Sequence, residues 1–204
     1  MHLTHRMFLL FWFILFAMVV PSVNTPEGNG GCTPLWTRFD NFCYRYFGGP
    51  KTWEEAEAYC LRFKIEDNIG HLVSIHNKSE NDLVHELWQS TITPPGLVEE
   101  LYEPKTNRAN GLWIGLEDRE VEREWHWSDN SPVNDFKNWR SFQPNDEDLD
   151  GTGEGEDCVH MYTRLHPWHW WYGDWSDTTC DRLLPFVCKL PACLWIHFTY
   201  LPAD

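Results

Sequence analysis

Apolar positions recur at helical spacing in a segment that begins shortly after residue 50. Thr52 can serve as an N-cap, and Glu55 three residues later completes a capping box, so a helix is predicted over residues 53–63. Five residues share one face of this helix: Trp53, Ala56, Tyr59, Cys60 and Phe63. This face is therefore expected to be buried.

A second amphipathic segment is expected to begin near Asn77 or Ser79 and to end at about Gln89. Its buried face comprises Leu83, Leu87 and Trp88. The sequence Asn77-Lys78-Ser79 is also a glycosylation sequon, which makes Asn77 a candidate glycosylation site. The alternative is that this sequence only caps the helix.

Short runs rich in aromatic and β-branched residues predict strands. They cover residues 36–47 (two strands joined by a turn), 72–75, 113–116, 125–127, 159–162 and 185–188. Residues 91–111 contain several prolines and are expected to form a surface insertion loop. Two helices among short strands and long loops indicate an α+β fold, which disulfides and bound ions would hold rigid.

The N-terminus has the pattern of a secretory signal. His2, His5 and Arg6 precede an apolar run over residues 7–20, and small residues follow it. We therefore expect a signal peptide at residues 1–22, a linker at 23–31 and a secreted mature protein without a membrane span. An uncleaved anchor is the alternative.

The formal net charge of −15 excludes nucleic acid as a natural partner, because phosphate neutralisation requires a basic face. The acidic residues concentrate in the loop 143–158, whose carboxylate and amide oxygens suit Ca²⁺. The alternative is a solvated acidic loop. No serine or histidine lies in a recognisable nucleophilic or metalloprotease motif, so the chain is not expected to be an enzyme.

A rival calcium motif overlaps this loop. Asp146, Asp148 and Asp150-Gly151, with Asp157 at the twelfth place, match the EF-hand loop pattern. An EF-hand needs a flanking helix on each side, whereas Pro144 precedes the loop and a predicted strand follows it. The overlap still favours calcium, and the additional acids offer ligands for a further ion.

All seven cysteines follow the signal segment. Six of them predict three disulfides in an oxidising compartment, and spacing leaves all 15 pairings of six cysteines open. Cys193, in the tail 191–204, is the candidate for an interchain bridge and hence a disulfide-linked homodimer. A free or capped thiol is the alternative.

Several motifs together resemble the C-type lectin-like domain family over nearly all of residues 32–190. They are Cys32 with Trp36 and Phe42-Cys43-Tyr44; Trp53, Ala56 and Cys60; Trp113-Ile114-Gly115-Leu116; Gln143-Pro144-Asn145; Gly155-Glu156-Asp157-Cys158; Trp175-Ser176-Asp177 with Cys180; and Phe186-Val187-Cys188. The pattern is most similar to soluble, single-domain invertebrate lectins of the long form. The resemblance implies two helices, two small antiparallel sheets and a long calcium-binding loop region.

The resemblance also implies three disulfides: Cys32–Cys43, Cys60–Cys188 and Cys158–Cys180. The first marks the long form of the domain. The second ties the first helix to the last strand, and the third joins the acidic loop to the segment 175–177.

By position in the family, one Ca²⁺ would coordinate two adjacent sugar hydroxyls directly. Its ligands, which would also bind the sugar, are Gln143, Asn145, Glu156 and Asp177. The Gln143–Pro144 bond is expected to be cis, which only X-Pro bonds adopt at low cost. Gln143 favours galactose-type sugars.

This sequence departs from the family pattern at two positions. The family has one carboxylate in the Glu-Pro-Asn or Gln-Pro-Asp selector, whereas this chain has two amides, and Ser176 replaces an amide ligand. Fewer charged ligands weaken calcium binding. Two amides also blur the donor and acceptor asymmetry that separates mannose-type from galactose-type sugars.

A second calcium ion is implied at a neighbouring set of acids. Its ligands would be Asp118, Glu122, Asp146 and Asp157, with the carbonyl of Glu156. The alternative is that Asp118 and Glu122 are ordinary surface acids after a strand.

The aromatic segment 166–172 lies just before Trp175. Trp170 is the candidate platform for a sugar ring, with Trp168 and Trp171 beside it, and core packing is the alternative. His166 and His169 lack a third ligand for a zinc site.

Together these features predict a secreted, calcium-dependent protein that binds glycans or glycoproteins. The alternative is a structural or interaction protein of the same fold that binds a protein, mineral or ice surface and uses calcium only for stability. The paired amides and Ser176 are the features that separate these two hypotheses.

Overall fold

The computed structural model describes residues 31–92, 111–147, 155–163 and 173–193. The predicted signal peptide and linker, most of the proline-containing loop, Asp148 and Asp150, Trp170 with the aromatic segment around it, and the tail beyond Cys193 lie outside these residues. Within them, no helix is long and apolar enough to cross a membrane.

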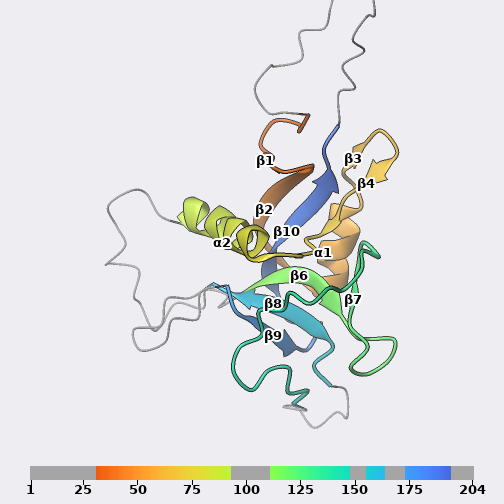
Figure 1. Ribbon diagram of the computed structural model, residues 1–204, viewed down its shortest axis with the longest axis vertical. Helices are drawn as coiled ribbons and strands as arrows, with labels where there is room; N and C mark the ends of the chain where they lie inside the picture. The colour runs from red at the N-terminus through yellow and green to blue at the C-terminus, as the bar shows by residue number, and fades with distance from the viewer. Residues whose placement is uncertain (1–30, 93–110, 148–154, 164–172, 194–204) are drawn as a thin grey trace, which may run out of the picture.

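Most strands join in one twisted sheet (Figure 1). The strands are β1 (Thr37–Phe39), β2 (Phe42–Lys51), β3 (Lys64–Ile65), β4 (Asn68–Ile69), β5 (His71–Leu72), β6 (Gly111–Glu117), β7 (His126–Trp127), β8 (Cys158–Tyr162), β9 (Trp175–Thr178) and β10 (Leu184–Pro191). The main path runs β1-β2-β10-β6-β8-β9; β5 pairs with β10, β7 with β6, and β3 with β4 alone.

The α+β class is confirmed, but the sheet arrangement differs in detail from the expectation of two small antiparallel sheets. β6 and β10 pair in parallel at Trp113 and Phe186, which joins the strands on either side into a single sheet. This parallel pair is possible because residues 118–183, including the acidic loop, lie between the two strands in sequence and provide the long crossover connection.

Helix α1 (Trp53–Cys60) begins with the predicted capping box: Thr52 Oγ1 accepts from the Glu55 amide, and the Glu55 carboxylate accepts from the Thr52 amide. The prediction extended the helix too far, to residue 63. After Cys60 the chain turns, and the Phe63 amide donates to the Cys60 carbonyl at 3.0 Å. Phe63 nevertheless packs against the core from this turn.

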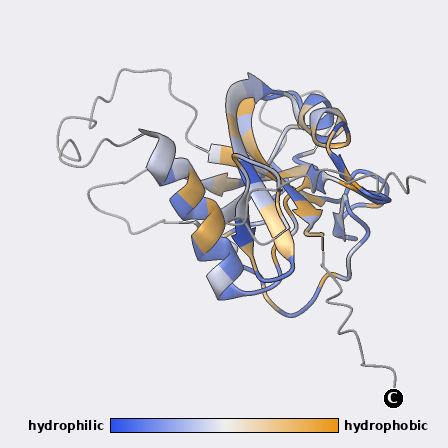
Figure 2. Ribbon diagram, turned by 90° about the horizontal axis from the view of Figure 1, so that it is seen from above, coloured by the Kyte–Doolittle hydropathy of each residue, from blue (hydrophilic) through white to orange (hydrophobic). Residues whose placement is uncertain are grey.

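Helix α2 (Lys78–Ile92) begins where predicted, because the Asn77 side chain accepts from the Glu80 amide at 2.9 Å. Asn77 is thus a helix cap, and its side chain is exposed. Apolar and hydrophilic residues alternate along the helix (Figure 2). The fully buried apolar residue is Val84, whereas the predicted Leu83, Leu87 and Trp88 are partly buried at the edge of the core.

The predicted disulfides Cys32–Cys43, Cys60–Cys188 and Cys158–Cys180 are all present.

The helices α1 and α2 flank β2 and β10 from two sides (Figure 1). Trp113 and Phe186 are fully buried in the core on the α1 side. Trp175, on β9, is buried in a second core cluster that reaches toward the loops.

Two strand predictions need correction, and three strands, β3, β4 and β9, were not predicted. Residues 73–75 lie outside β5, although the Val73 amide still donates to the Val187 carbonyl at 2.9 Å. Trp125 precedes β7. β3 and β4 are only two residues long each and pair with one another. The third unpredicted strand is β9, which pairs with β8 with Val159 opposite Asp177. Its polar residues hide the alternation that identifies strands in a sequence.

Candidate functional site

The site is built on the turn that follows Trp139. The backbone of Trp139 pairs with that of Trp175 of β9 in an isolated parallel β-bridge. The Arg140 amide donates to the Trp175 carbonyl at 2.9 Å. The Gln143 amide then donates to the Arg140 carbonyl at 3.0 Å, which closes a turn. The next peptide bond, Gln143–Pro144, is cis, as expected. The sheet therefore anchors the segment that carries the two selector amides.

Asp177 joins this turn to β9. Its Oδ2 accepts hydrogen bonds from the backbone amides of Asn145, at 2.9 Å, and Asp146, at 2.8 Å. The Asp177 side chain is almost fully buried. Three residues that sequence reasoning assigned to ligand sets are thus brought together by direct hydrogen bonds.

The acidic loop returns to the same place through Asp146. Its Oδ1 accepts from the Glu156 amide at 3.0 Å. A Cβ atom on Gly155 would lie only 1.9 Å from that oxygen, so glycine is required for this close approach. Sequence reasoning gave Gly155 no specific task, although its position directly before Glu156-Asp157-Cys158 was a usable signal.

The predicted ligands carry oxygens without partners. Within the described residues, the buried oxygens Gln143 Oε1, Asn145 Oδ1, Asp177 Oδ1 and Asp118 Oδ1 accept no hydrogen bond. Buried polar atoms in folded proteins are normally hydrogen-bonded, and an unpaired one is costly. Oxygens that lack a proton donor and point inward are suited to a cation.

The carboxylates near these oxygens are electrostatically destabilised. Burial, and then the neighbouring Asp177 carboxylate, raise the pKa of Glu156 to about 7. Burial also raises the pKa of Asp177, although the backbone amides of Asp146 and Asn145 oppose the shift. A bound cation would reverse these shifts, because it favours the charged form of each carboxyl group.

The second predicted set is partly assembled. The Asp118 amide donates to the Asp157 carbonyl at 3.1 Å, and Asp118 Oδ2 accepts from the Arg123 amide at 2.9 Å. Burial raises the pKa of Asp118 to about 6, with further contributions from the Glu122 and Asp157 charges. Glu122 is half-exposed and lies 3.7 Å from the Arg123 guanidinium. This set is therefore more open than the first.

The residues fit a calcium ion through mixed oxygen ligands. Within the described ranges, no three His, Cys, Asp or Glu side chains are grouped so that they alone would hold a metal. The first set does not depend on such a group, because two of its four side chains are amides. Calcium accepts amide and carboxylate oxygens alike in irregular geometry.

Three other predicted features have different outcomes. Ser176 is buried and its hydroxyl donates to the Asp177 carbonyl at 3.3 Å, so it is directed to its own backbone. Cys193 is not disulfide-bonded; its thiol lies 3.3 Å from Glu66 Oε1. Its amide donates to the Gly31 carbonyl, which places the two ends of the domain together. Trp170 lies outside the described residues.

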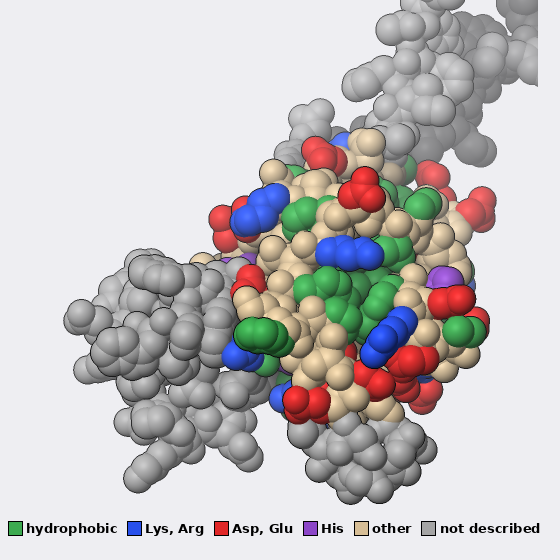
Figure 3. All heavy atoms as spheres, turned by 60° about the horizontal axis from the view of Figure 1, so that its bottom comes forward, with side chains coloured by type: hydrophobic (Ala, Val, Ile, Leu, Met, Phe, Trp, Pro, Cys, Tyr) green, Lys and Arg blue, Asp and Glu red, His purple; other side chains and the backbone are tan. Residues whose placement is uncertain are grey.

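The loop end of the molecule is acidic and partly apolar. Figure 3 shows this end turned forward, with Asp and Glu side chains beside a central group of hydrophobic ones. Such a mixed surface offers both charged and apolar contacts to a ligand.

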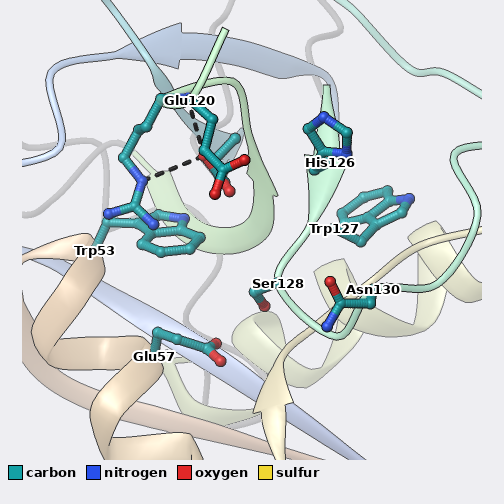
Figure 4. A pocket seen from close by; sticks show the side chains of 9 residues that line it. Trp53, Glu57, Glu120, His126, Trp127, Ser128 and Asn130 are labelled. Atoms are coloured by element: carbon teal, nitrogen blue, oxygen red, sulfur yellow. Dashed lines mark hydrogen bonds and ion pairs between the residues drawn. The ribbon is translucent and has the colours of Figure 1, made fainter. Parts of the chain in front are cut away.

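A separate cavity of about 230 Å³ lies between α1 and the β6–β7 region (Figure 4). It is lined by Trp53, Glu57, Glu117, Arg119, Glu120, His126, Trp127, Ser128 and Asn130, and so contains none of the predicted ligands. Glu57 binds His71 and the Leu72 amide there, and Glu117 binds Arg119. These two carboxylates are satisfied by protein partners.

The family model for the Lectin C-type domain matches residues 49–190. The chain is 37% identical to an alpha-N-acetylgalactosamine-specific lectin of Patiria pectinifera, over 77% of this chain and 79% of the relative. It is 33% identical to echinoidin of Heliocidaris crassispina, over 81% of this chain and 99% of echinoidin.

Among solved structures, the lectin CEL-I from Cucumaria echinata superposes with a TM-score of 0.61 at 25% identity. The match covers 79% of this chain and 98% of that one. Lectins bind carbohydrate without enzymatic turnover, so the expectation that this chain is not an enzyme is confirmed. With a family match over most of its length and invertebrate lectins among its relatives, the chain belongs to the C-type lectin family.

Proposed function

We propose that the protein binds carbohydrate through a calcium ion held by Gln143, Asn145, Glu156 and Asp177. The observation that carries the proposal is the group of buried oxygens without partners on Gln143, Asn145 and Asp177. The calcium ion, when bound, would coordinate two adjacent hydroxyls of the sugar. The side chains of Gln143 and Asn145 would hydrogen-bond the same hydroxyls and so select among sugars.

Galactose-type sugars are the favoured ligands. Gln143 occupies the selector position that is typical of galactose-type members of the family. The starfish relative, whose name states specificity for alpha-N-acetylgalactosamine, supports the same class. Glycoproteins that carry such sugars are accordingly the proposed partners.

A second calcium ion would be held by Asp118, Glu122, Asp146 and Asp157 with the carbonyl of Glu156. These four carboxylates are not grouped closely enough in the described structure to hold a metal by themselves, so the ion would have to draw them together. Its support is the inward-facing Asp118 Oδ1 and the mutual repulsion of these acids. Asp146 connects the two proposed sites. It is a proposed ligand of the second ion, and its carboxylate accepts a hydrogen bond from the amide of Glu156, a proposed ligand of the first. Occupation of the second site would therefore stabilise the first.

We also propose secretion after removal of residues 1–22, a domain at 32–190 between a linker and a tail, glycosylation at Asn77 and a disulfide-linked dimer through Cys193. Asn77 is exposed, and its cap uses only the side-chain oxygen. Comparison of wild type with Cys193→Ser on non-reducing gels tests the dimer, which is disproved if wild type migrates as a monomer.

A glycan array with calcium and with chelator tests the main proposal. Wild type should bind galactose-type glycans only with calcium, and Asp177→Asn should lose that signal. Asp181→Asn is the matched control, because Asp181 is an exposed residue whose carboxylate accepts a hydrogen bond from the Thr179 hydroxyl and belongs to neither proposed ligand set. Equal binding by wild type in chelator would refute the calcium-bridged mechanism.

The alternative is a structural or interaction protein that uses calcium for stability alone. The observation that favours it is the weak charge of the first set, where Glu156 and Asp177 are the only carboxylates. Calcium-induced stabilisation without any glycan signal on the array would select this alternative.

A further inference from the structure

Phe142, the residue before Gln143, is the most exposed large hydrophobic side chain among the described residues. Its relative exposure is 95%, whereas Val121 near the second proposed site is 50% exposed. It is also the one aromatic residue in that group of exposed side chains. Exposure alone has little meaning, because single apolar side chains are common on protein surfaces.

The backbone of Phe142 distinguishes it from an ordinary surface residue. Its φ angle is +69°, in the left-handed region that favours glycine and that bulky side chains rarely adopt. Fold stability alone would therefore favour glycine at this position. A strained residue near a binding site is a reason to look for a function of its side chain.

The turn holds Phe142 in a fixed place. The Gln143 amide donates to the Arg140 carbonyl, and the Arg140 amide donates to Trp175 of β9. Trp175 is fully buried. The aromatic ring thus projects from a turn anchored in the core.

Phe142 and Gln143 present their side chains differently. The oxygen of Gln143 is buried and has no hydrogen-bond partner within the described residues, whereas Phe142 is in solvent. Phe142 directly precedes Gln143 in the chain, but its ring is in solvent and is not among the proposed ligands. An exposed ring next to a ligand residue is in a position to contact the part of a glycan that extends beyond the sugar held at the ion.

We propose that Phe142 forms an apolar subsite for the part of the ligand beyond the ion-held sugar. This part would be the nonpolar face of a second sugar ring or an apolar aglycone, which packs on the aromatic ring. The inference rests on the proposed function, since it places the first sugar at Gln143 and Asn145. It assigns extended specificity to a residue that precedes the selector in sequence, whereas the acidic insertion follows it.

The test compares two probes, methyl β-galactoside and phenyl β-galactoside, by calorimetry at saturating calcium. Wild type should bind the phenyl glycoside threefold to tenfold more tightly than the methyl glycoside. Phe142→Gly should reduce this ratio to about one and leave methyl glycoside and calcium binding unchanged. Phe142→Trp should retain the preference. An unchanged ratio in Phe142→Gly overturns the inference.

Leu35 offers a matched control. It is also exposed, at 77%, with a φ angle of +73°, but it lies in the N-terminal segment between Cys32 and Cys43. Leu35→Gly should, like Phe142→Gly, relieve the backbone and raise the unfolding temperature without altering the phenyl-to-methyl ratio. An equal fall of the ratio in both variants counts against a subsite at Phe142.

The outcomes separate the inference from the proposed function. If wild type binds neither glycoside, and a glycan array with calcium also gives no signal, both the proposed function and the subsite fail. If the methyl glycoside binds only with calcium and the ratio does not respond to Phe142→Gly, the subsite alone fails.

Discussion

Two buried clusters of polar side chains in this protein each contain two charged groups but differ in how their polar atoms are satisfied. In the core, Lys189 Nζ lies 2.5 Å from Glu80 Oε1 and donates to the Ser74 carbonyl at 3.0 Å. Glu80 also accepts from the Tyr44 hydroxyl at 2.6 Å and from the His76 amide at 2.7 Å. Burial, and then Glu80, raise the pKa of Tyr44 well above its usual range, so the phenol stays a donor.

The loop cluster has the opposite character. Gln143, Asn145 and Asp177 have buried oxygens that accept nothing within the described residues, and the pKa of Glu156 is raised. The difference shows that the number of charges does not identify a ligand site. A cluster whose hydrogen bonds are all made stabilises the fold, whereas a cluster of acceptors without donors is the kind that a bound cation would stabilise.

The largest expected effect comes from breaking the core cluster. Lys189→Met leaves Glu80 as an uncompensated buried charge and should lower the free energy of unfolding by about 3–5 kcal/mol. Adding Glu80→Gln should recover part of that loss. Urea denaturation measures both variants. A loss below about 1 kcal/mol in the single variant would show that the Lys189–Glu80 pair contributes little to the free energy of unfolding.

Breaking the loop cluster should have a smaller, calcium-dependent effect. A ligand at a hundredfold excess over its Kd stabilises the folded state by about 2.7 kcal/mol, and Asp177→Asn should abolish most of that gain. In chelator the variant should be at least as stable as wild type, because the amide oxygen still accepts the two loop amides without a buried charge. Thermal unfolding with and without calcium measures this. A large loss in chelator would mean that Asp177 is structural.

Adding a charge should sharpen the same cluster. Gln143→Glu supplies a third carboxylate beside Glu156 and Asp177, so calcium affinity should rise about tenfold, or about 1.4 kcal/mol. Calcium titration followed by intrinsic tryptophan fluorescence measures the change. Gln89→Glu, in α2, is the control for charge alone. Unaltered calcium affinity would remove Gln143 from the ligand set.

The smallest effect concerns a satisfied pair outside both clusters. His71 Nδ1 lies 2.7 Å from Glu57 Oε1, and this hydrogen bond raises the pKa of His71 above 6.5. Its stabilisation is therefore complete below pH 6.5 and is lost as pH rises through the raised value.

Glu57→Gln should remove this pH dependence, at a cost of about 0.5–1 kcal/mol for a partly buried pair at low pH. Urea unfolding curves recorded from below pH 6.5 to above the raised pKa of His71 measure the free energy of unfolding of both proteins. Identical pH profiles for wild type and variant would contradict the assignment.

Much of the fold could be predicted because its signals are local. The capping box at Thr52 and Glu55, the Asn77 helix start and the apolar strand over 113–116 lie within short windows, where periodicity is informative. The disulfides and the cis bond came from resemblance to the family, since cysteine spacing left many pairings open. β9 was not predicted because its residues include the polar Ser176 and Asp177 and do not alternate between apolar and polar. They are buried because β9 pairs with β8.

The sequence by itself determined the fold class, the family and the residues available to hold an ion. Only the tertiary structure decided which oxygens remain without donors. Asp177 meets the amides of Asn145 and Asp146 across more than thirty residues of chain. Glu80 finds Lys189 across more than a hundred. Long-range contacts of this kind depend on how strands pair. Local periodicity therefore could not show that Glu80 has hydrogen-bond donors for its carboxylate, whereas Asp177 keeps one carboxylate oxygen without a donor among the described residues.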